Sequence, residues 1–370
     1  MAGVDAGTIV AFVLGVVGLI GGAELLVRGS ARLAARTGLS SVVIGLTVVS
    51  FGTSAPELAV STKAALDGTG DLAVGNVVGS NVANVLLILG AAAVVGGGLV
   101  VAQRIVRLDV PLMIGASALV MVFAAGGGIS RLEGAVLVGL LVGYVVWTVR
   151  SARHESLEVA TEYDDAIDPE ALARTPVWVD LALVAGGLVL LVVGSDLLVG
   201  SASTIAEALG ASDLVVGLTV VAIGTSLPEL ATSVLAALKG ERDIAVGNAV
   251  GSNLFNLLGV LGVTAVVSTG GLAVSQAART FDLPIMTAVA VACLPVFFNG
   301  YELKRWEGGV FLAYYVGYIA YLVLDATGHG SVDLVRDAAL LFVAPLTVLT
   351  LVVVTVQGWR AHRAGTVRPT

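Results

Sequence analysis

Two segments place hydroxyl, proline and carboxylate residues at matched positions inside apolar sequence. Residues 45–61 read GLTVVSFGTSAPELAVS, and residues 217–233 read GLTVVAIGTSLPELATS, 172 positions further on. Each copy brings Thr, Ser and Pro next to a glutamate, Glu57 in the first copy and Glu229 in the second. A carboxylate within an apolar segment costs several kcal/mol unless something compensates its charge. Two carboxylates at matched positions therefore predict a shared cation site.

Each proline is expected to break its helix beside the glutamate. Proline lacks an N–H group and clashes with the carbonyl four residues back, so Pro56 and Pro228 should free the carbonyls of Gly52 and Gly224. Non-helical backbone inside a membrane is tolerated only where it faces protein or water. Such breaks are typical of binding sites in transporters.

A second pair of matched segments adds further oxygen atoms. Residues 75–90 read GNVVGSNVANVLLILG, and residues 247–262 read GNAVGSNLFNLLGVLG, at the same offset. Each copy holds a Ser and an Asn four residues apart, which places both on one helical face. These residues are Ser80 and Asn84 in the first copy and Ser252 and Asn256 in the second. Carboxylates, hydroxyls, amides and freed carbonyls suit hard cations such as Na⁺ and Ca²⁺.

For the neighbouring asparagines, a ligand role and a role in helix packing are equally compatible with the sequence. These residues are Asn76, Asn81, Asn248 and Asn253.

The composition indicates an all-α polytopic membrane protein. Hydrophobic residues make up 57% of the chain and charged residues only 12%, about half the charge of a soluble domain. Eleven apolar stretches are long enough to cross about 30 Å of hydrocarbon: 8–27, 40–63, 72–100, 108–126, 132–149, 177–199, 213–237, 244–268, 280–298, 306–324 and 333–356.

Several kinds of chemistry are not expected. The single cysteine offers no disulfide or thiolate cluster, and His154, His329 and His362 lie in loops or the tail. There is no Ser/His pairing, HExxH or P-loop, so we expect neither an enzyme nor an ATP-driven pump, and neither a cofactor nor a nucleic-acid partner.

The repeat extends over two units of five helices each. Glu24-Leu25-Leu26-Val27 matches Asp196-Leu197-Leu198-Val199, and 131–134 matches 305–308. The units are 1–150, with its motif region at 45–90, and 177–324, with its motif region at 217–262. Because five is odd, the second unit must enter the membrane upside down, which makes ten core helices of inverted topology. An acidic linker at 151–176 joins the units, and 325–370 adds an eleventh span and a tail.

The basic residues set the predicted orientation in a cell membrane. With the N-terminus outside, 15 of the 19 Lys and Arg residues face the cytoplasm, as the positive-inside rule requires. Arg28, Arg32 and Arg36 are assigned to a cytoplasmic loop after the first helix, and the C-terminus is placed in the cytoplasm.

Four acids outside the motifs receive other roles. Glu24 and Asp196, near helix ends, are expected to snorkel or to pair with a loop arginine, and a gating role is the alternative. Asp109 and Asp282, each two residues before a proline, are expected to cap helices.

The paired GTSAPEL and GTSLPEL segments, followed by GNVVGSN and GNAVGSN, resemble the α-repeats of the sodium/calcium exchangers within the cation/Ca²⁺ exchanger superfamily. The resemblance covers about residues 8–324. It implies ten core helices around a diamond of four ion sites, antiport of Na⁺ against Ca²⁺, and sliding of the first and sixth helices during alternating access.

Carried over position by position, the resemblance also implies a ligand set. Its side chains are Thr53, Ser54, Glu57, Ser80, Asn84, Thr225, Ser226, Glu229, Ser252 and Asn256, with the backbone carbonyls of Ser50 and Ala222. Relatives carry Asp where this chain has Asn256, so two carboxylates remain to balance one Ca²⁺ or two Na⁺.

Three transport functions fit these residues. Na⁺-driven extrusion of Ca²⁺ by a monomer is the first, and H⁺/Ca²⁺ antiport by protonation of the same glutamates is the second. A cation channel is the third, although channels usually assemble a filter from identical subunits around an axis, whereas inverted repeats with broken helices are typical of alternating access.

Overall fold

The computed structural model describes residues 4–152, 175–216, 219–220 and 222–328, with Val332 and Val352 as single residues. In these residues the regular secondary structure is helical apart from four strands of two residues each. Eight helices are long and apolar enough to cross a membrane, and the bent pair Ser41–Thr53 and Ala55–Leu66 makes a ninth. This confirms an all-α polytopic membrane protein.

The helices of the first unit run as follows: α1 Ala6–Thr37, α2 Ser41–Ile44, α3 Ser50–Thr53, α4 Ala55–Leu66, α5 Gly70–Ala83, α6 Gly90–Val95, α7 Val110–Ala124 and α8 Arg131–Ala152. π-Helical turns join some of them: η1 Gly45–Val49, η2 Asn84–Leu89 and η3 Ile105–Asp109.

The second unit repeats the pattern: α11 Val177–Ala208, α12 Asp213–Val216, α13 Ala222–Gly224, α14 Leu227–Leu238, α15 Arg242–Leu254, η5 Phe255–Val260, α16 Leu261–Val267, η6 Ala278–Asp282, α17 Leu283–Phe298 and α18 Arg305–Ala326. The stretch 213–237 corresponds to α12, α13 and α14, although some of its residues are not described. The eleventh stretch, 333–356, lies outside the described residues except for Val352.

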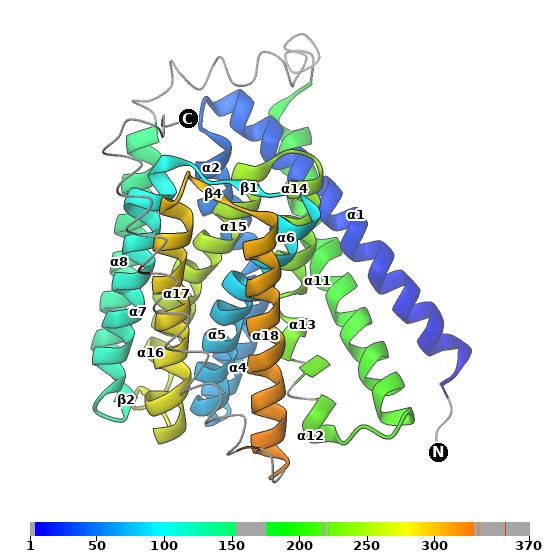
Figure 1. Cartoon of the computed structure of the whole chain (residues 1–370), viewed down its shortest axis with the longest axis vertical. Helices are drawn as coiled ribbons and strands as arrows, with labels where there is room; N and C mark the ends of the chain where they lie inside the picture. Colours follow the sequence, from blue (N-terminus) through cyan, green and yellow to red (C-terminus); the bar gives the residue numbers. More distant parts are fainter. Residues whose placement is uncertain are drawn as a thin grey trace.

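The two longest helices, α1 and α11, are repeat counterparts that lie side by side and run in opposite directions (Figure 1). Glycines let their backbones meet: a Cβ on Gly15 would lie 2.9 Å from the carbonyl oxygen of Gly194, and one on Gly22 would lie 2.8 Å from that of Gly187. Small residues at crossings are how membrane helices approach closely. Since Gly15 and Gly187 are 172 positions apart, as are Gly22 and Gly194, each contact is the counterpart of the other.

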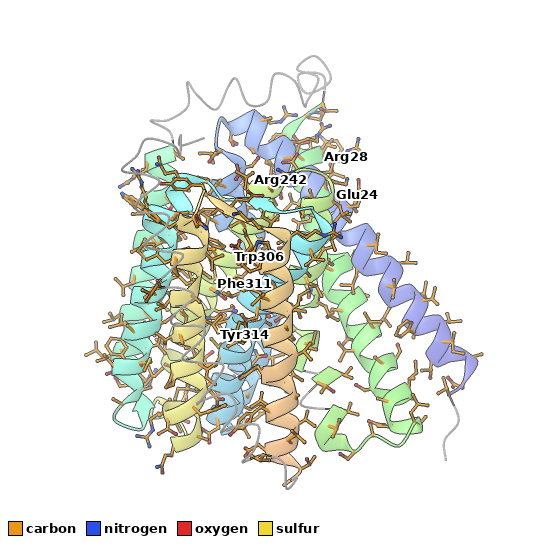
Figure 2. The ribbon with its side chains drawn as sticks, viewed as in Figure 1. Glu24, Arg28, Arg242, Trp306, Phe311 and Tyr314 are labelled. Carbon is orange, nitrogen blue, oxygen red and sulfur yellow. The ribbon has the colours of Figure 1, made fainter. Side chains whose placement is uncertain are left out.

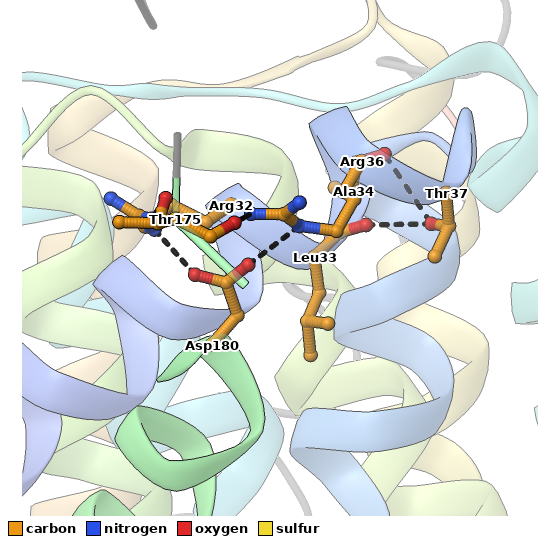
Figure 3. Close-up of polar contacts among 7 residues, drawn as sticks. All are labelled: Arg32, Leu33, Ala34, Arg36, Thr37, Thr175 and Asp180. Carbon is orange, nitrogen blue, oxygen red and sulfur yellow. Dashed lines mark hydrogen bonds and ion pairs between the residues drawn. The ribbon is translucent and has the colours of Figure 1, made fainter. Parts of the chain in front are cut away.

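An ionic cluster joins one end of the α1–α11 pair (Figure 3). The buried carboxylate of Asp180 accepts from Arg32 Nε at 2.5 Å and from Arg36 Nε at 2.8 Å. The same guanidinium groups donate to the hydroxyl and carbonyl oxygens of Thr175 at 2.5 and 2.8 Å. The assignment of these arginines to a loop was wrong, because α1 continues to residue 37 and the buried carboxylate of Asp180, on the neighbouring α11, gives Arg32 and Arg36 a charged partner.

Two short strand pairs tie the units together. β1 (Leu99–Val100) pairs with β4 (Glu302–Leu303), and β2 (Gly128–Ile129) pairs with β3 (Leu272–Ala273), both antiparallel. Figure 1 places β1 and β4 at the opposite end of the bundle from β2. Each pair takes one strand from each unit, so backbone hydrogen bonds join the two units at both ends of the molecule.

The α1–α11 crossing yields a stability prediction. Gly187→Ala should lower the free energy of unfolding by about 1–3 kcal/mol through overpacking, because the added methyl would lie 2.6 Å from the backbone nitrogen of Leu26. Gly186→Ala is the matched control, since a Cβ there has nothing within 4 Å. Thermal unfolding of the purified protein in detergent measures both, and equal melting temperatures would contradict the close crossing.

Candidate functional site

The first helix break lies at the start of α4 and confirms the expected kink. α3 ends at Thr53 and α4 begins at Ala55, with a bend of 43° between the two parts of the span. Pro56 and Glu57 occupy the first turn of α4, where proline is tolerated and where the helix dipole favours negative charge. Ser54, at the break, has φ −79° and ψ 3°.

The second break is its counterpart. α13 ends at Gly224 and α14 begins at Leu227, with Glu229 in the first turn. The carbonyl oxygen of Gly224 is outside the helical ladder and accepts a hydrogen bond from the Ser195 hydroxyl at 2.6 Å. Both repeats therefore place a glutamate in the first turn of a new helix.

Glu57 belongs to the first unit, but its carboxylate faces hydroxyls of the second. It is fully buried, and its Oε1 accepts from the Ser80 hydroxyl at 3.1 Å. The hydroxyls of Thr225 and Ser226 also interact with the carboxylate. Its other oxygen, Oε2, has no hydrogen-bond partner.

Glu229 shows the reciprocal arrangement. It is fully buried and interacts with the hydroxyls of Thr53 and Ser54 and with the charge of Glu57, yet neither of its oxygens meets the geometry of a hydrogen bond. The Thr53 hydroxyl also lies 3.4 Å from that of Ser252. Each glutamate thus lies beside two hydroxyls at the helix break of the opposite unit, and the charge of Glu57 acts on Glu229.

Ser80 connects three of the elements around the two glutamates. Besides donating to Glu57, its Oγ lies 3.0 Å from the Ser226 hydroxyl and accepts from Asn256 Nδ2 at 3.1 Å. A single hydroxyl on α5 therefore contacts α4, the break before α14, and η5.

Unpartnered acceptors are concentrated here. Asn84 donates through Nδ2 to Asn253 Oδ1 at 3.0 Å, which leaves its own Oδ1 without a partner. In the described part of the chain, buried oxygens of the expected ligand residues that lack a hydrogen bond are Ser54 Oγ, Glu57 Oε2, Glu229 Oε1 and Oε2, Asn84 Oδ1 and Asn256 Oδ1. Because burying unpaired acceptors costs free energy, this set suits a cation.

Asn76 and Asn248 use both ends of their amides in hydrogen bonds around the two breaks, as a role in helix packing would require. Asn76 Nδ2 donates to the Ser61 hydroxyl at 3.0 Å and to the Glu57 carbonyl at 3.5 Å, while its Oδ1 accepts from Thr225. Asn248 repeats all three contacts with Ser233, Glu229 and Thr53. The repeated offset singled these residues out, but only the contacts show that both ends of each amide are used.

The two expected carbonyl ligands lie beside the breaks. The carbonyl of Ser50, in α3, accepts from the backbone nitrogen of Ser54 at 3.0 Å. The Ser50 hydroxyl lies 2.7 Å from the carbonyl oxygen of Gly45 and 3.0 Å from that of Asn248. Ala222 is the first residue of α13. All twelve expected site residues thus fall on the two breaks and on the helices that flank them.

The peripheral acids behave differently from expectation. Asp109 and Asp282 make no side-chain cap, and the buried Asp109 instead accepts from Tyr144 OH at 3.0 Å. Glu24, labelled with Arg28 on α1 in Figure 2, forms an ion pair with Lys239. Its partner is therefore a lysine just after α14 and not a loop arginine.

The assembled chemistry is that of oxygen ligands alone. Within the residues that the structure describes, no group of three or more His, Cys, Asp or Glu side chains gathers. Two carboxylates with surrounding hydroxyls and amides match hard cations, and they contain no thiolate or imidazole for softer metals.

Known proteins share this architecture. The family model described as sodium/calcium exchanger protein matches residues 7–150 and 179–324. CaxA of Alkalimonas amylolytica, described as a candidate antiporter, is 41% identical over 83% of this chain and 96% of its own length. The sodium/calcium exchanger MaX1 of Methanosarcina acetivorans is 32% identical over 84% of this chain and 96% of its own length.

The fold agrees with the sequence match. A solved structure of the sodium-calcium exchanger NCX_Mj, soaked with zero Na⁺ and Ca²⁺, superposes with a TM-score of 0.72 at 31% identity, covering 85% of this chain and 99% of that one. The family model matches most of the chain, in two parts that coincide with the two repeated units. The chain therefore belongs to the sodium/calcium exchanger protein family.

Proposed function

We propose that the chain exchanges Na⁺ for Ca²⁺ across a cell membrane, with Ca²⁺ leaving as Na⁺ enters. Its family is one of ion exchangers and not of enzymes. The observation that carries the proposal is the reciprocal burial of Glu57 and Glu229, each against hydroxyls of the other unit. MaX1 and NCX_Mj, both named as sodium/calcium exchangers, support it.

The proposed ligands are the twelve residues of the two breaks and their flanking helices. Two carboxylates balance one Ca²⁺ or two Na⁺, so the same oxygens would hold either ion and binding of one would expel the other. Because one chain supplies the whole set, we propose a monomer as the transporting unit. Protons are the second candidate coupling ion, since the unpaired oxygens of Glu229 would also accept them.

We further propose ten core helices as two inverted units, 1–150 and 177–324, joined by a cytoplasmic linker at 151–176, with an eleventh span within 325–370. The antiparallel course of α1 and α11 supports the inversion. The N-terminus would lie outside and the C-terminus in the cytoplasm, with the Arg32–Arg36–Asp180 cluster on the cytoplasmic side as the positive-inside rule favours.

Alternating access is supported by unequal packing of equivalent helix faces. Gly247 and Gly251 of α15 are buried, whereas their counterparts Gly75 and Gly79 of α5 are exposed and partly exposed. Asn248 is fully buried, and its counterpart Asn76 is only partly buried. We infer that the site opens along α5 toward the outside and that the second state reverses the two faces.

Transport in vesicles tests the function directly. Proteoliposomes loaded with Na⁺ should take up ⁴⁵Ca²⁺ when external Na⁺ is removed, and uptake should saturate with external Ca²⁺. The Na⁺ and pH gradients are imposed independently. Uptake that follows the pH gradient and ignores Na⁺ would assign H⁺ as the coupling ion, and non-saturable flux without counter-transport would indicate a channel.

The glutamates should be indispensable. Glu57→Gln and Glu229→Gln should each reduce exchange at least about tenfold, because the loss of a charged ligand removes more than about 1.4 kcal/mol of binding free energy. Glu207→Gln, at an exposed position on α11, should leave exchange unchanged. Initial rates of Na⁺-dependent ⁴⁵Ca²⁺ uptake at equal protein density measure the effect, and wild-type rates in either variant would remove that residue from the site.

The face of α5 that carries Gly75 and Gly79 should be needed for turnover and not for ion binding. Gly79→Ala should retain Ca²⁺ binding in this state but lower exchange about tenfold or more, because its methyl would fill the surface that must close in the second state. Gly115→Ala on α7, where a Cβ meets nothing within 4 Å, is the control. The Ca²⁺-induced rise in melting temperature measures binding, and normal exchange by Gly79→Ala would contradict the reversal of the two faces.

A further inference from the structure

We propose that Met113, which carries no oxygen and lies behind the site, is a positioning residue that fixes the orientation of the Asn84 amide. The proposal deepens the proposed cation exchange, because it concerns one of its expected ligands. Met113 is fully buried on α7, a helix that contributes no residue to the expected ligand set.

A chain of two hydrogen bonds links the sulfur to the ligand. Asn253 Nδ2 donates to Met113 Sδ at 3.2 Å, and Asn84 Nδ2 donates to Asn253 Oδ1 at 3.0 Å. All three side chains are at most 2% exposed. The last atom of the chain, Asn84 Oδ1, has no hydrogen-bond partner.

The sulfur decides the donor-to-acceptor direction of both hydrogen bonds. An asparagine amide can be turned by 180°, and its two ends are distinguished only by their partners. A thioether has no hydrogen to donate and only accepts, so Asn253 must turn its NH₂ group toward Met113 and its oxygen toward Asn84. Asn84 must then turn its own NH₂ group toward Asn253.

The consequence for Asn84 is electrostatic. With its NH₂ group held by Asn253, its oxygen is the end left to face a cation. In the flipped orientation the NH₂ group would carry partial positive charge toward the ion and repel it. Met113 therefore selects the binding orientation of a residue that it does not touch.

The other unit contains the same residue types but does not form the same pair of hydrogen bonds. Met286 on α17 is the counterpart of Met113, and Asn81 Nδ2 donates to its sulfur at 3.7 Å. Asn81 Oδ1 has no hydrogen-bond partner, because the Asn256 amide donates to Ser80 instead. The relay from sulfur to ligand is complete only from Met113, so Met286 serves as a matched control.

The test is a comparison of Met113→Leu with Met286→Leu. Leucine conserves volume but cannot accept a hydrogen bond. Met113→Leu should raise the Ca²⁺ concentration for half-maximal binding and uptake about fivefold, while the melting temperature without Ca²⁺ and the maximal uptake rate stay close to wild type. Met286→Leu should change the half-maximal concentration less than about twofold.

Ca²⁺-induced stabilisation of the purified protein and ⁴⁵Ca²⁺ uptake in proteoliposomes provide the two readouts. An unchanged half-maximal concentration in Met113→Leu, an equal shift in both leucine variants, or a lower melting temperature with unchanged affinity would each overturn the relay. A wild-type protein that neither binds nor exchanges Ca²⁺ would instead overturn the proposed function, so the two failures are distinguishable.

Discussion

A carboxylate in an apolar interior must find compensation, and the arrangement of this molecule follows from that constraint. Glu57 and Glu229 lie beside hydroxyls of the opposite unit, yet three of their four carboxylate oxygens have no hydrogen bond, so the remaining compensation falls to a cation. Neither unit alone contains a complete environment for its own glutamate. The glycine crossing of α1 with α11 and the exchanged strand pairs hold the two units in the register that these contacts need.

The helix breaks and π-helical turns are the local devices that make this arrangement possible. Each break starts a new helix just before a glutamate, so that the unpaired N–H groups of a first turn lie beside a negative charge. η2 begins at Asn84, and η5 begins one residue before Asn256. π-Turns are common at functional positions because an extra residue per turn redirects side chains. Irregular backbone therefore occurs at several of the expected ligands, although η3 and η6 lie away from them.

The sequence pattern predicted which residues lie together where those residues belong to a repeated segment. The offset of 172 residues grouped Glu57 with Glu229 because both copies fold alike and meet at one place. Contacts without a repeated or periodic signal were not predictable. Nothing in the sequence linked Asp180 to Arg32, or Asp109 to Tyr144, because such pairs depend on how distant helices cross. The orientation of the Asn84 amide was likewise hidden, since it depends on a methionine two contacts away.

The two units also differ in the charges at equivalent positions. Glu24 pairs with Lys239 in this structure, and their repeat counterparts are Asp196 and Asp67, which are both acidic. If the units exchange roles, the contact that is attractive here becomes a contact between like charges, with Lys63, one turn before Asp67, as the basic residue of that helix end. Like charges in contact cost free energy while opposite charges gain it. This contact therefore favours the conformation described here over one in which the two units exchange roles.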